Sequence, residues 1–234
     1  MKLGIIGAMD VEVAMLKEHM TEKKTEQRGK IEFCIGKLEG LDVVVAQCGV
    51  GKINAAVCAQ TMCDRYEVTH LVNTGIAGSL DNELDIADVV ISRDAMYHDV
   101  DATHFGYPYG QVPGLDVVAF PADEKLMELA YAASEKTNPG HTKYGRIATG
   151  DMFVSRNEAK RLIIEHTGAN CTEMEGAAIA QVAYQNGVPF VIIRAISDKA
   201  DDSAEMDYPT FERLAAEHCA SITRTLARNL SVLS

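Results

Sequence analysis

The segment Val188-Pro-Phe-Val-Ile-Ile-Arg-Ala-Ile-Ser-Asp198 decides the fold class of this chain. Its residues 188–196 form a nearly continuous apolar run, which is typical of a central strand covered on both faces. Similar runs begin at Asp42, in Asp-Val-Val-Val-Ala, and at Asp88, in Asp-Val-Val-Ile. Strands of this kind occur where helices cover both faces of a sheet, so the segment favours an α/β fold.

The rest of the chain alternates between strand-like and helical patterns. Strands are predicted at about 2–7, 31–36, 42–48, 69–74, 88–93, 144–149 and 188–196, and helices at about 10–20, 51–66, 123–137, 156–166, 173–186 and 209–230. The run 31–36 alternates, and with 42–48 it predicts a hairpin across Leu38-Glu39-Gly40. The pattern predicts one domain, residues 1–234, folded as a three-layer α/β/α sandwich around a mixed, mostly parallel sheet.

Composition excludes several classes of partner. The 234 residues carry a formal net charge of -12, which argues against a nucleic-acid backbone or an anionic membrane surface. No stretch approaches the roughly 18 apolar residues of a membrane span, and the N-terminal apolar run is too short for a signal peptide. The six cysteines form no C-x-x-C pair, so they are interpreted as reduced residues of a cytoplasmic protein. A small nucleoside without phosphate remains compatible with the charge.

Three acidic residues and one arginine are the strongest candidates for chemistry. Glu12 follows the first strand-like run, Glu175 lies in a Thr-Glu-Met-Glu-Gly segment, and Arg194 and Asp198 end the run 188–198. The carboxyl ends of parallel strands form the edge where α/β sheets bind small molecules. Each acid also has a structural interpretation: Glu12 at a helix N-terminus, Glu175 in a capping box with Thr172, and Asp198 as a turn or cap residue. Their combination favours acid–base chemistry on a polar, neutral or cationic substrate.

Two glycine-containing turns follow strands. Gly49-Val-Gly-Lys-Ile-Asn54 lacks the third glycine of a dinucleotide fingerprint and the hydroxyl residue of a phosphate-binding loop, so a tight strand-to-helix turn is predicted. Asn73-Thr-Gly-Ile-Ala-Gly-Ser79 is either a tight turn or a pocket floor whose backbone approaches a ligand.

The longest irregular stretch, about 95–121, predicts a functional loop. Its segment His98-Asp-Val-Asp-Ala-Thr-His104 has no spacing typical of a metal site. Its continuation, 105–113, is rich in aromatic residues, glycine and proline, and predicts an aromatic lid or a contact with a partner subunit.

Several motifs together resemble the bacterial 5'-methylthioadenosine/S-adenosylhomocysteine nucleosidases. The matching segments, in chain order from about residue 1 to 230, are Gly4-Ile-Ile-Gly-Ala-Met9-x-x-Glu12, Asn73-Thr-Gly, Tyr97-His-Asp, Thr103-x-Phe105-Gly-Tyr107-x-Tyr109-Gly-Gln-x-Pro113-Gly, Gly150-Asp-x-Phe153, Glu173-Met-Glu175 and Arg194-Ala-Ile-Ser-Asp198. The resemblance implies the nucleoside phosphorylase-like α/β/α fold, a homodimer, and no metal or organic cofactor. It also implies hydrolysis of methylthioadenosine and adenosylhomocysteine in methionine salvage and methyl-cycle recycling.

The resemblance also implies a role for each matching residue. Asp198 would protonate the purine at N7, Glu12 would act on the attacking water with help from Arg194, and Glu175 with Met174 would hold the ribose. Phe153 would stack on the base and the Val154 backbone would bind its edge. The 5'-thio pocket would be formed by Met9, Phe105, Tyr107, Pro113 and Tyr208, with part of the 97–113 loop coming from the other subunit. Further substrate-binding positions are expected at Ile76, Ala77, Gly78, Glu173 and Ser197.

This chain departs from the family pattern at Ile76, where many members carry serine. The hydroxyl of that serine lies near the water and the ribose, so the substitution removes one potential hydrogen bond. No proton-transferring group is lost, and activity is still expected.

Three other functions compete with hydrolysis. A phosphorylase needs cationic groups and backbone donors for phosphate, whereas the first strand-to-helix loop here carries Asp10 and Glu12 and no arginine. A non-catalytic nucleoside-binding protein would not need all three acids. A dinucleotide-dependent oxidoreductase would need the complete glycine fingerprint. The sequence does not rank methylthioadenosine, adenosylhomocysteine, 5'-deoxyadenosine and aminodeoxyfutalosine as substrates.

Overall fold

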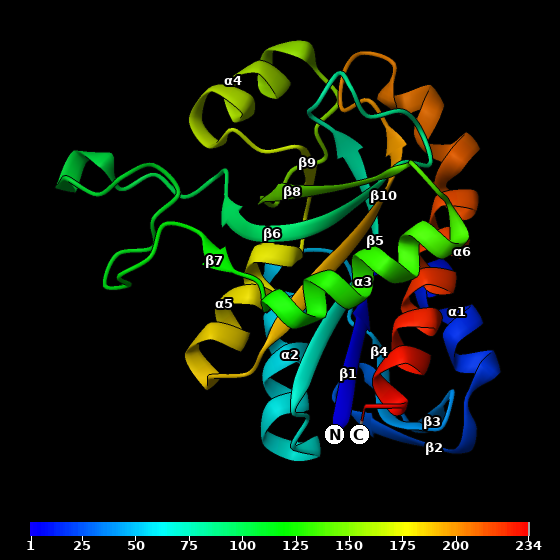
Figure 1. The fold of residues 1–234 in the computed structure, drawn as a ribbon. Coiled ribbons are helices and arrows are strands. Elements are labelled where there is room, and N and C mark those ends of the chain that lie inside the picture. Colours follow the sequence, from blue (N-terminus) through cyan, green and yellow to red (C-terminus); the bar gives the residue numbers. More distant parts are fainter. Residues whose placement is uncertain (234) are drawn as a thin grey trace.

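A ten-stranded mixed sheet with helices on both faces forms the centre of the molecule (Figure 1). The structure is a computed structural model, and it describes residues 1–233. The strands are β1 (Lys2–Gly7), β2 (Thr21–Arg28), β3 (Ile31–Leu38), β4 (Leu41–Gln47), β5 (His70–Ser79), β6 (Val89–Tyr97), β7 (Phe120–Pro121), β8 (Thr142–Thr149), β9 (Cys171–Glu173) and β10 (Phe190–Asp198). The helices are α1 (Asp10–His19), α2 (Lys52–Tyr66), a short 3-10 helix η1 (Thr103–Phe105), α3 (Glu124–Thr137), α4 (Asn157–Thr167), α5 (Gly176–Asn186) and α6 (Ala204–Ser231).

The helices form the outer layers predicted from the alternating pattern. On one face, α2 and α5 pack against each other and bury a core that includes Met62 and Ile179. On the other face, α1, α3 and α6 cover a second core that includes Leu16 and Ile222. The strands between these cores are buried on both sides, which is why their sequences are continuous apolar runs rather than alternating ones.

The strand order is β10-β6-β8-β9-β5-β1-β4-β3-β2, with β7 paired to β6. The centre, β4-β1-β5-β10, is parallel, as predicted. Antiparallel pairing is more common than predicted. Strand β10 is antiparallel to β6, and β2, β3 and β4 form an antiparallel meander. The short strands β9 and β7 pair antiparallel with β5 and β6. Because β5 also pairs with β9, the strands β5, β10, β6, β8 and β9 close into a ring at one side of the sheet.

Five local features differ from the sequence prediction. The segment 73–79, predicted as a tight turn or a pocket floor, is the C-terminal part of strand β5, and its residues Ile76, Ala77 and Gly78 do line the cavity described below. The strand β2 was not predicted, because Thr-Glu-Lys-Lys-Thr-Glu-Gln-Arg is a charged, mostly exposed edge strand without an apolar period. The segment 171–173 is β9 rather than the start of the helix predicted at 173. Helix α6 begins five residues before the predicted position 209 and contains Pro209. Part of the predicted loop 95–121 is regular, because β6 continues to Tyr97 and η1 and β7 lie within it.

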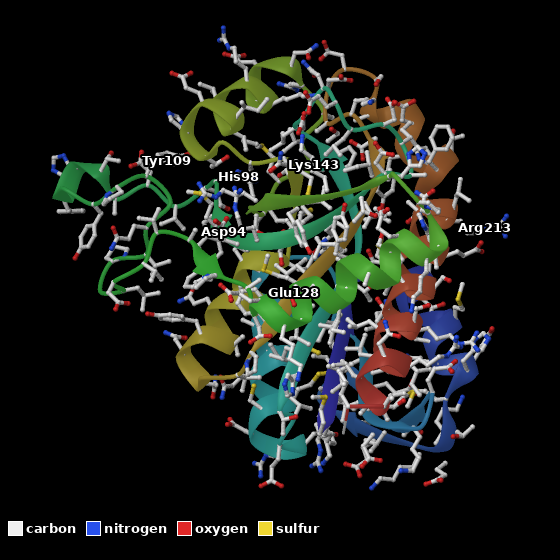
Figure 2. All side chains as sticks on the ribbon, in the orientation of Figure 1. Asp94, His98, Tyr109, Glu128, Lys143 and Arg213 are labelled. Carbon is white, nitrogen blue, oxygen red and sulfur yellow. The ribbon has the colours of Figure 1, made fainter. Side chains whose placement is uncertain are left out.

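The remaining loop projects from the body of the molecule (Figure 1). Its base is fastened where the Tyr109 hydroxyl donates a hydrogen bond to the His98 carbonyl over 2.7 Å (Figure 2). All six cysteines are free, and five of them are buried. Among the described residues, no helix is both long and apolar enough to cross a membrane.

Candidate active site

An open cavity lies where the parallel strands β1, β5 and β10 end. The position agrees with the general location of ligand sites at the carboxyl ends of α/β sheets. Its lining consists of Ala8, Met9, Glu12, Val50, Ile76, Ala77, Gly78, Phe153, Thr172, Glu173, Met174, Glu175, Ser197, Asp198 and Tyr208. The three acids singled out in the sequence therefore share one cavity.

Glu12 is buried beneath the first turn of α1 and accepts three backbone hydrogen bonds. Its Oε2 accepts the N–H groups of Ala8 at 2.6 Å and Met9 at 3.0 Å, and its Oε1 accepts the N–H of Ile76 at 3.1 Å. Burial raises the pKa of Glu12, while Arg194 and the three N–H donors lower it. The carboxyl group is thus held in one orientation and has more basic character than an exposed glutamate.

Arg194 is buried, does not line the cavity, and connects the three glutamates Glu12, Glu173 and Glu175. Its guanidinium donates to the Asn73 side chain at 2.5 Å and to Glu173, and it lies 4.0 Å from Glu12 and 3.8 Å from Glu175. Burial lowers its pKa, but the three glutamates outweigh that effect and raise it. A glycine is required opposite it, because a Cβ atom at Gly75 would overlap the arginine.

Glu173 has a supporting role that the sequence did not reveal. Its Oε2 accepts the backbone N–H groups of Glu175 at 3.1 Å and Gly176 at 2.7 Å, and its Oε1 accepts the Thr149 hydroxyl. Glu173 therefore caps α5, as carboxylates do at helix N-termini. The alternative interpretation of Glu175 as a capping-box partner of Thr172 is not supported, because Glu175 bonds Gly51 and the Glu173 carboxylate caps α5 instead.

Glu175 points away from its own helix and into the cavity. Its Oε1 accepts the N–H of Gly51, at the start of α2, over 2.8 Å. Burial, followed by repulsion from Glu173, raises the pKa of Glu175 to about 8, although Arg194 and the Gly51 N–H oppose this shift. A carboxyl group that changes charge near neutral pH is a common feature of catalytic sites.

Asp198 is the last residue of β10 and lines the cavity. Its Oδ1 accepts the Ala200 N–H and its Oδ2 accepts the Ser197 hydroxyl, each over 2.8 Å. Burial raises the pKa of Asp198 in spite of these two donors. The group is therefore more easily protonated than an exposed aspartate, as a general acid must be. Asp198 is therefore more than a turn residue, because its Oδ1 caps the turn while the residue also lines the cavity.

Comparison with known proteins identifies the family of this site. Residues 2–228 match the family model described as "Phosphorylase superfamily". The 5'-methylthioadenosine/S-adenosylhomocysteine nucleosidase of Bacillus velezensis is 40% identical over 235 residues, covering 98% of this chain and 100% of the relative. This chain belongs to the 5'-methylthioadenosine/S-adenosylhomocysteine nucleosidase family. Nucleosidases are N-glycosidic hydrolases, so the acids lie in the cavity of a hydrolytic enzyme.

Solved structures of the nucleosidase family have the same fold. The Neisseria meningitidis nucleosidase in complex with methylthio-immucillin-A matches with a TM-score of 0.95 at 38% identity, covering 97% of this chain and 99% of that one. The futalosine hydrolase of Helicobacter pylori matches with a TM-score of 0.92 at 30% identity, covering 97% of both chains. The nucleoside phosphorylase-like fold expected from the sequence is therefore confirmed.

Most residues assigned from the nucleosidase resemblance surround the cavity. Twelve line it, Arg194 contacts the acids without lining it, and Val154 lines a smaller adjoining cavity. Phe105, Tyr107 and Pro113 are not among the lining residues of either cavity. They lie on the projecting loop, where Phe105 is 78% exposed.

Sequence reasoning missed four contributors to the site. Val50, Ala8 and Thr172 line the cavity, and Gly51 supplies the hydrogen bond to Glu175. The turn 49–54 was correctly predicted as a strand-to-helix connection, but no local signal shows that it faces an acid 124 positions later. Ile76 contributes its backbone N–H to Glu12 rather than a side-chain hydroxyl. Among the described residues no cluster of three metal-ligating side chains occurs.

Proposed function

We propose that the protein hydrolyses the N-glycosidic bonds of 5'-methylthioadenosine and S-adenosylhomocysteine, releasing adenine with 5-methylthioribose or S-ribosylhomocysteine. The observation that carries this proposal is the meeting of Glu12, Glu175 and Asp198 in one cavity beside the buried Arg194. Cleavage builds positive charge on the sugar and negative charge on the departing base. A protonated acid and ionised carboxylates in the same cavity are suited to that charge separation.

Each acid has a role that fits its surroundings. Asp198 donates a proton toward N7 of the purine, which its raised pKa favours. Glu12 accepts a proton from the attacking water, and its two orienting contacts with the α1 turn fix the direction of that transfer. Glu175 accepts hydrogen bonds from the ribose hydroxyls and, when ionised, stabilises the oxocarbenium-like sugar. No metal or organic cofactor has a part in these steps.

The remaining residues bind the substrate. Phe153 is 46% exposed at the mouth of the cavity and lies edge-on to Tyr208, with ring centroids 5.4 Å apart. An adenine ring that stacks on Phe153 would therefore lie between the acid on β10 and this aromatic pair. Met9 receives a contact from the Tyr208 hydroxyl at 3.3 Å, which supports an apolar 5'-thio pocket at that end. The Val154 backbone is the candidate donor for the adenine edge.

Hydrolysis is favoured over phosphorolysis by the charge of the cavity. No lysine or arginine is among its lining residues, and the buried Arg194 is already engaged with Glu173 and Asn73. A phosphate ion would meet Glu12 and Glu175 without a free cation to bind it. A water molecule has no such repulsion.

We also propose that the active form is a homodimer. Val50, in the turn before α2, and Ile53 and Val57 on α2 form an exposed apolar stripe, with exposures of 49%, 77% and 53%. Val50 also lines the cavity, so a partner covering the stripe would reach the rim of the site. The projecting loop with its exposed Phe105 is the candidate for that contact. A cytoplasmic location is compatible with the six free cysteines.

The test is incubation with 5'-methylthioadenosine, with and without phosphate, followed by measurement of adenine and the sugar product. We expect adenine and 5-methylthioribose in both reactions. Adenine that appears only with phosphate, together with a sugar 1-phosphate, would identify a phosphorylase. No adenine in either reaction would contradict the proposed activity, and binding measurements would then test a non-catalytic nucleoside-binding protein. Adenosylhomocysteine, 5'-deoxyadenosine and aminodeoxyfutalosine under the same conditions would rank the substrates.

A further inference from the structure

The N–H group of Gly51 is the contact that orients Glu175, and the turn that carries it is held from outside the cavity. Gly51 is the N-cap of α2 and has φ +101° and ψ 158°, a conformation that side chains other than hydrogen rarely allow. Within the turn, the Asn54 side chain donates a hydrogen bond to the Val50 carbonyl over 2.7 Å. Contacts from two other segments hold the Gly51–Lys52 end of the turn.

Asp151 supplies the first of these contacts. Its Oδ1 accepts the backbone N–H of Lys52 over 2.9 Å, the residue directly after Gly51. A Cβ atom at Gly51 would lie 3.2 Å from the same oxygen, so the Asp151 carboxylate packs closely on the turn. The backbone N–H groups of Gly51 and Lys52 therefore bind different carboxylates: that of Gly51 binds Glu175 and that of Lys52 binds Asp151.

Asp99 supplies the second contact and joins the cluster together. Its Oδ2 accepts the Lys52 ammonium at 2.6 Å and the Asp151 backbone N–H at 2.9 Å. The Lys52 ammonium also lies 3.7 Å from Asp151 and 5.4 Å from the centre of the Tyr97 ring. Three segments far apart in the sequence, after β4, β6 and β8, are thus fastened at one point.

We propose that Lys52, Asp99 and Asp151 form a positioning cluster that holds the Gly51 N–H on Glu175 and so keeps Glu175 oriented for the ribose. None of the three lines the cavity, so their effect on the reaction passes through the turn. The predicted effect of the cluster on turnover rests on the proposed function. The predicted effect of the cluster on the pKa of Glu175 does not depend on any substrate.

The direction of the effect follows from the charges that face Glu175. Glu173 on β9 and Glu12 on α1 disfavour its ionised form, and Arg194 on β10 favours it. The Cys48 thiol, directly after β4, adds no charge near Glu175, because burial raises the pKa of the thiol. From α2, the Gly51 N–H and the positive end of the helix favour the ionised form. Loosening the turn removes this favourable contribution and leaves the repulsion from Glu173, so we expect the pKa of Glu175 to rise. Asp99→Ala is the sharper test, because loss of the Asp99 charge alone would lower that pKa, whereas loss of the Lys52 charge alone would raise it.

The first experiment is a ¹³C NMR titration of glutamate-labelled, substrate-free protein, with Glu175 assigned through Glu175→Gln. We expect Asp99→Ala and Lys52→Met to raise the pKa of Glu175 above the wild-type value of about 8, and Lys52→Arg to restore it. Lys143→Met is the matched control, because Lys143 also pairs with two acids, Asp81 at 2.7 Å and Glu83 at 2.9 Å, but outside the cavity (Figure 2). An unchanged Glu175 pKa in both variants would overturn the proposal.

The second experiment is the pH profile of kcat/KM for methylthioadenosine. We expect Asp99→Ala and Lys52→Met to lower kcat/KM about tenfold, as for loss of one hydrogen bond to a charged group, and to shift the acid limb to higher pH. A loss of activity that tracks a lower melting temperature with an unshifted limb would mean a purely structural role and would overturn the proposal. If the wild-type protein releases no adenine, the proposed function fails, while the NMR titration still decides the positioning role.

Discussion

At the scale of single residues, the cavity concentrates carboxyl groups under conditions that disfavour their charge. Burial is the largest cause of the raised pKa of Glu12, Glu175 and Asp198. Donors from backbone N–H groups and the single buried Arg194 offset only part of that cost. Buried carboxyl groups of this kind are expected at positions where the residue serves a reaction rather than the stability of the fold.

The stability cost of Glu175 leads to a prediction for Glu175→Gln. Its pKa in the folded state, about 8, exceeds its ordinary value of 4.5. Below pH 4.5 Glu175 is protonated in both the folded and the unfolded state, so it does not reduce the free energy of unfolding. As pH rises from 4.5 through 8, Glu175 ionises more readily in the unfolded state, and the free energy of unfolding falls. The variant cannot ionise there, so its melting temperature should exceed that of the wild type at pH 8 to 9 and approach it near pH 5. Turnover should be lost.

Differential scanning calorimetry of the substrate-free protein across that pH range checks this prediction. Glu128→Gln is the control, since Glu128 is exposed on α3 (Figure 2) and is not among the residues that line the cavity. A difference in melting temperature between wild type and Glu175→Gln that stays the same at every pH would contradict this prediction.

A second residue-scale prediction concerns proton donation by Asp198. Asn at this position keeps a side-chain carbonyl for the Ala200 N–H but has no acidic proton. We expect Asp198→Asn to reduce kcat about 10²- to 10⁴-fold, the usual range for general acid catalysis, with a much smaller change in adenine affinity. Steady-state kinetics and equilibrium binding of adenine separate the two effects. The exposed neighbour Asp202→Asn should behave as wild type, and a near-normal kcat for Asp198→Asn would exclude this role.

At the scale of elements, the end of β10 explains how two consecutive residues reach the same cavity. The register between β10 and β5 shifts between Ile196 and Asp198, so Ser197 is an irregularity in the strand. Neighbouring residues of a regular strand point to opposite faces, whereas a bulge re-aims side chains. Both Ser197 and Asp198 line the cavity as a result.

Sequence patterns predicted the buried elements well, because burial on both faces leaves a continuous apolar run such as 190–196. They failed for β2, whose pairing with β3 depends on backbone bonds rather than on apolar side chains. They also could not give the contact between Gly51 and Glu175 or the cap formed by Glu173, since both depend on how separate elements meet. The three acids that share the cavity could be singled out because each follows a recognisable strand or motif.

An element-scale prediction concerns the β3–β4 turn. Glu39 in that turn accepts hydrogen bonds from Arg224 and, over 2.8 Å, from Arg228, which lie one helical turn apart on α6. These bonds, that of Arg228 first, lower the pKa of Glu39 from 4.5 to about 2. Their stabilisation is therefore present above pH 4.5 and lost as pH falls through 2. At neutral pH, Glu39→Gln should cost about 1 kcal/mol, or about 2–4 °C in melting temperature, because the pairs are partly exposed.

Thermal unfolding at pH 7 and at the lowest pH at which the fold persists measures this effect. Glu217→Gln serves as the control, because its exposed pair with Arg213, at 3.7 Å, spans one turn of α6 alone. The difference between Glu39→Gln and wild type should shrink at low pH. An equal decrease in melting temperature for Glu39→Gln and Glu217→Gln at pH 7 would indicate that joining the turn to α6 stabilises the fold no more than an ion pair within the helix.

At the scale of the whole molecule, the two helical layers bury both faces of the sheet but leave part of the α2 surface apolar. The stripe Val50, Ile53 and Val57 has helical spacing and faces solvent, although residues at such positions normally face a core. The stripe begins at the cavity rim, so the open site and the uncovered surface are continuous. A second copy of the chain could cover both at once, with its projecting loop completing the 5' end of the pocket.

The proposed dimer gives a prediction that joins assembly to activity. We expect wild-type protein to sediment as two 25.4 kDa chains, and Ile53→Asp to sediment as one, because a charge in the centre of the stripe would have to be desolvated on association. The kcat/KM for methylthioadenosine should fall with the dimer, since Phe105 and its neighbours could no longer reach the partner's cavity. Leu214→Asp is the matched control: Leu214 is 56% exposed on α6, outside the stripe. A fully active monomeric wild type would rule out both the dimer and its contribution to the site.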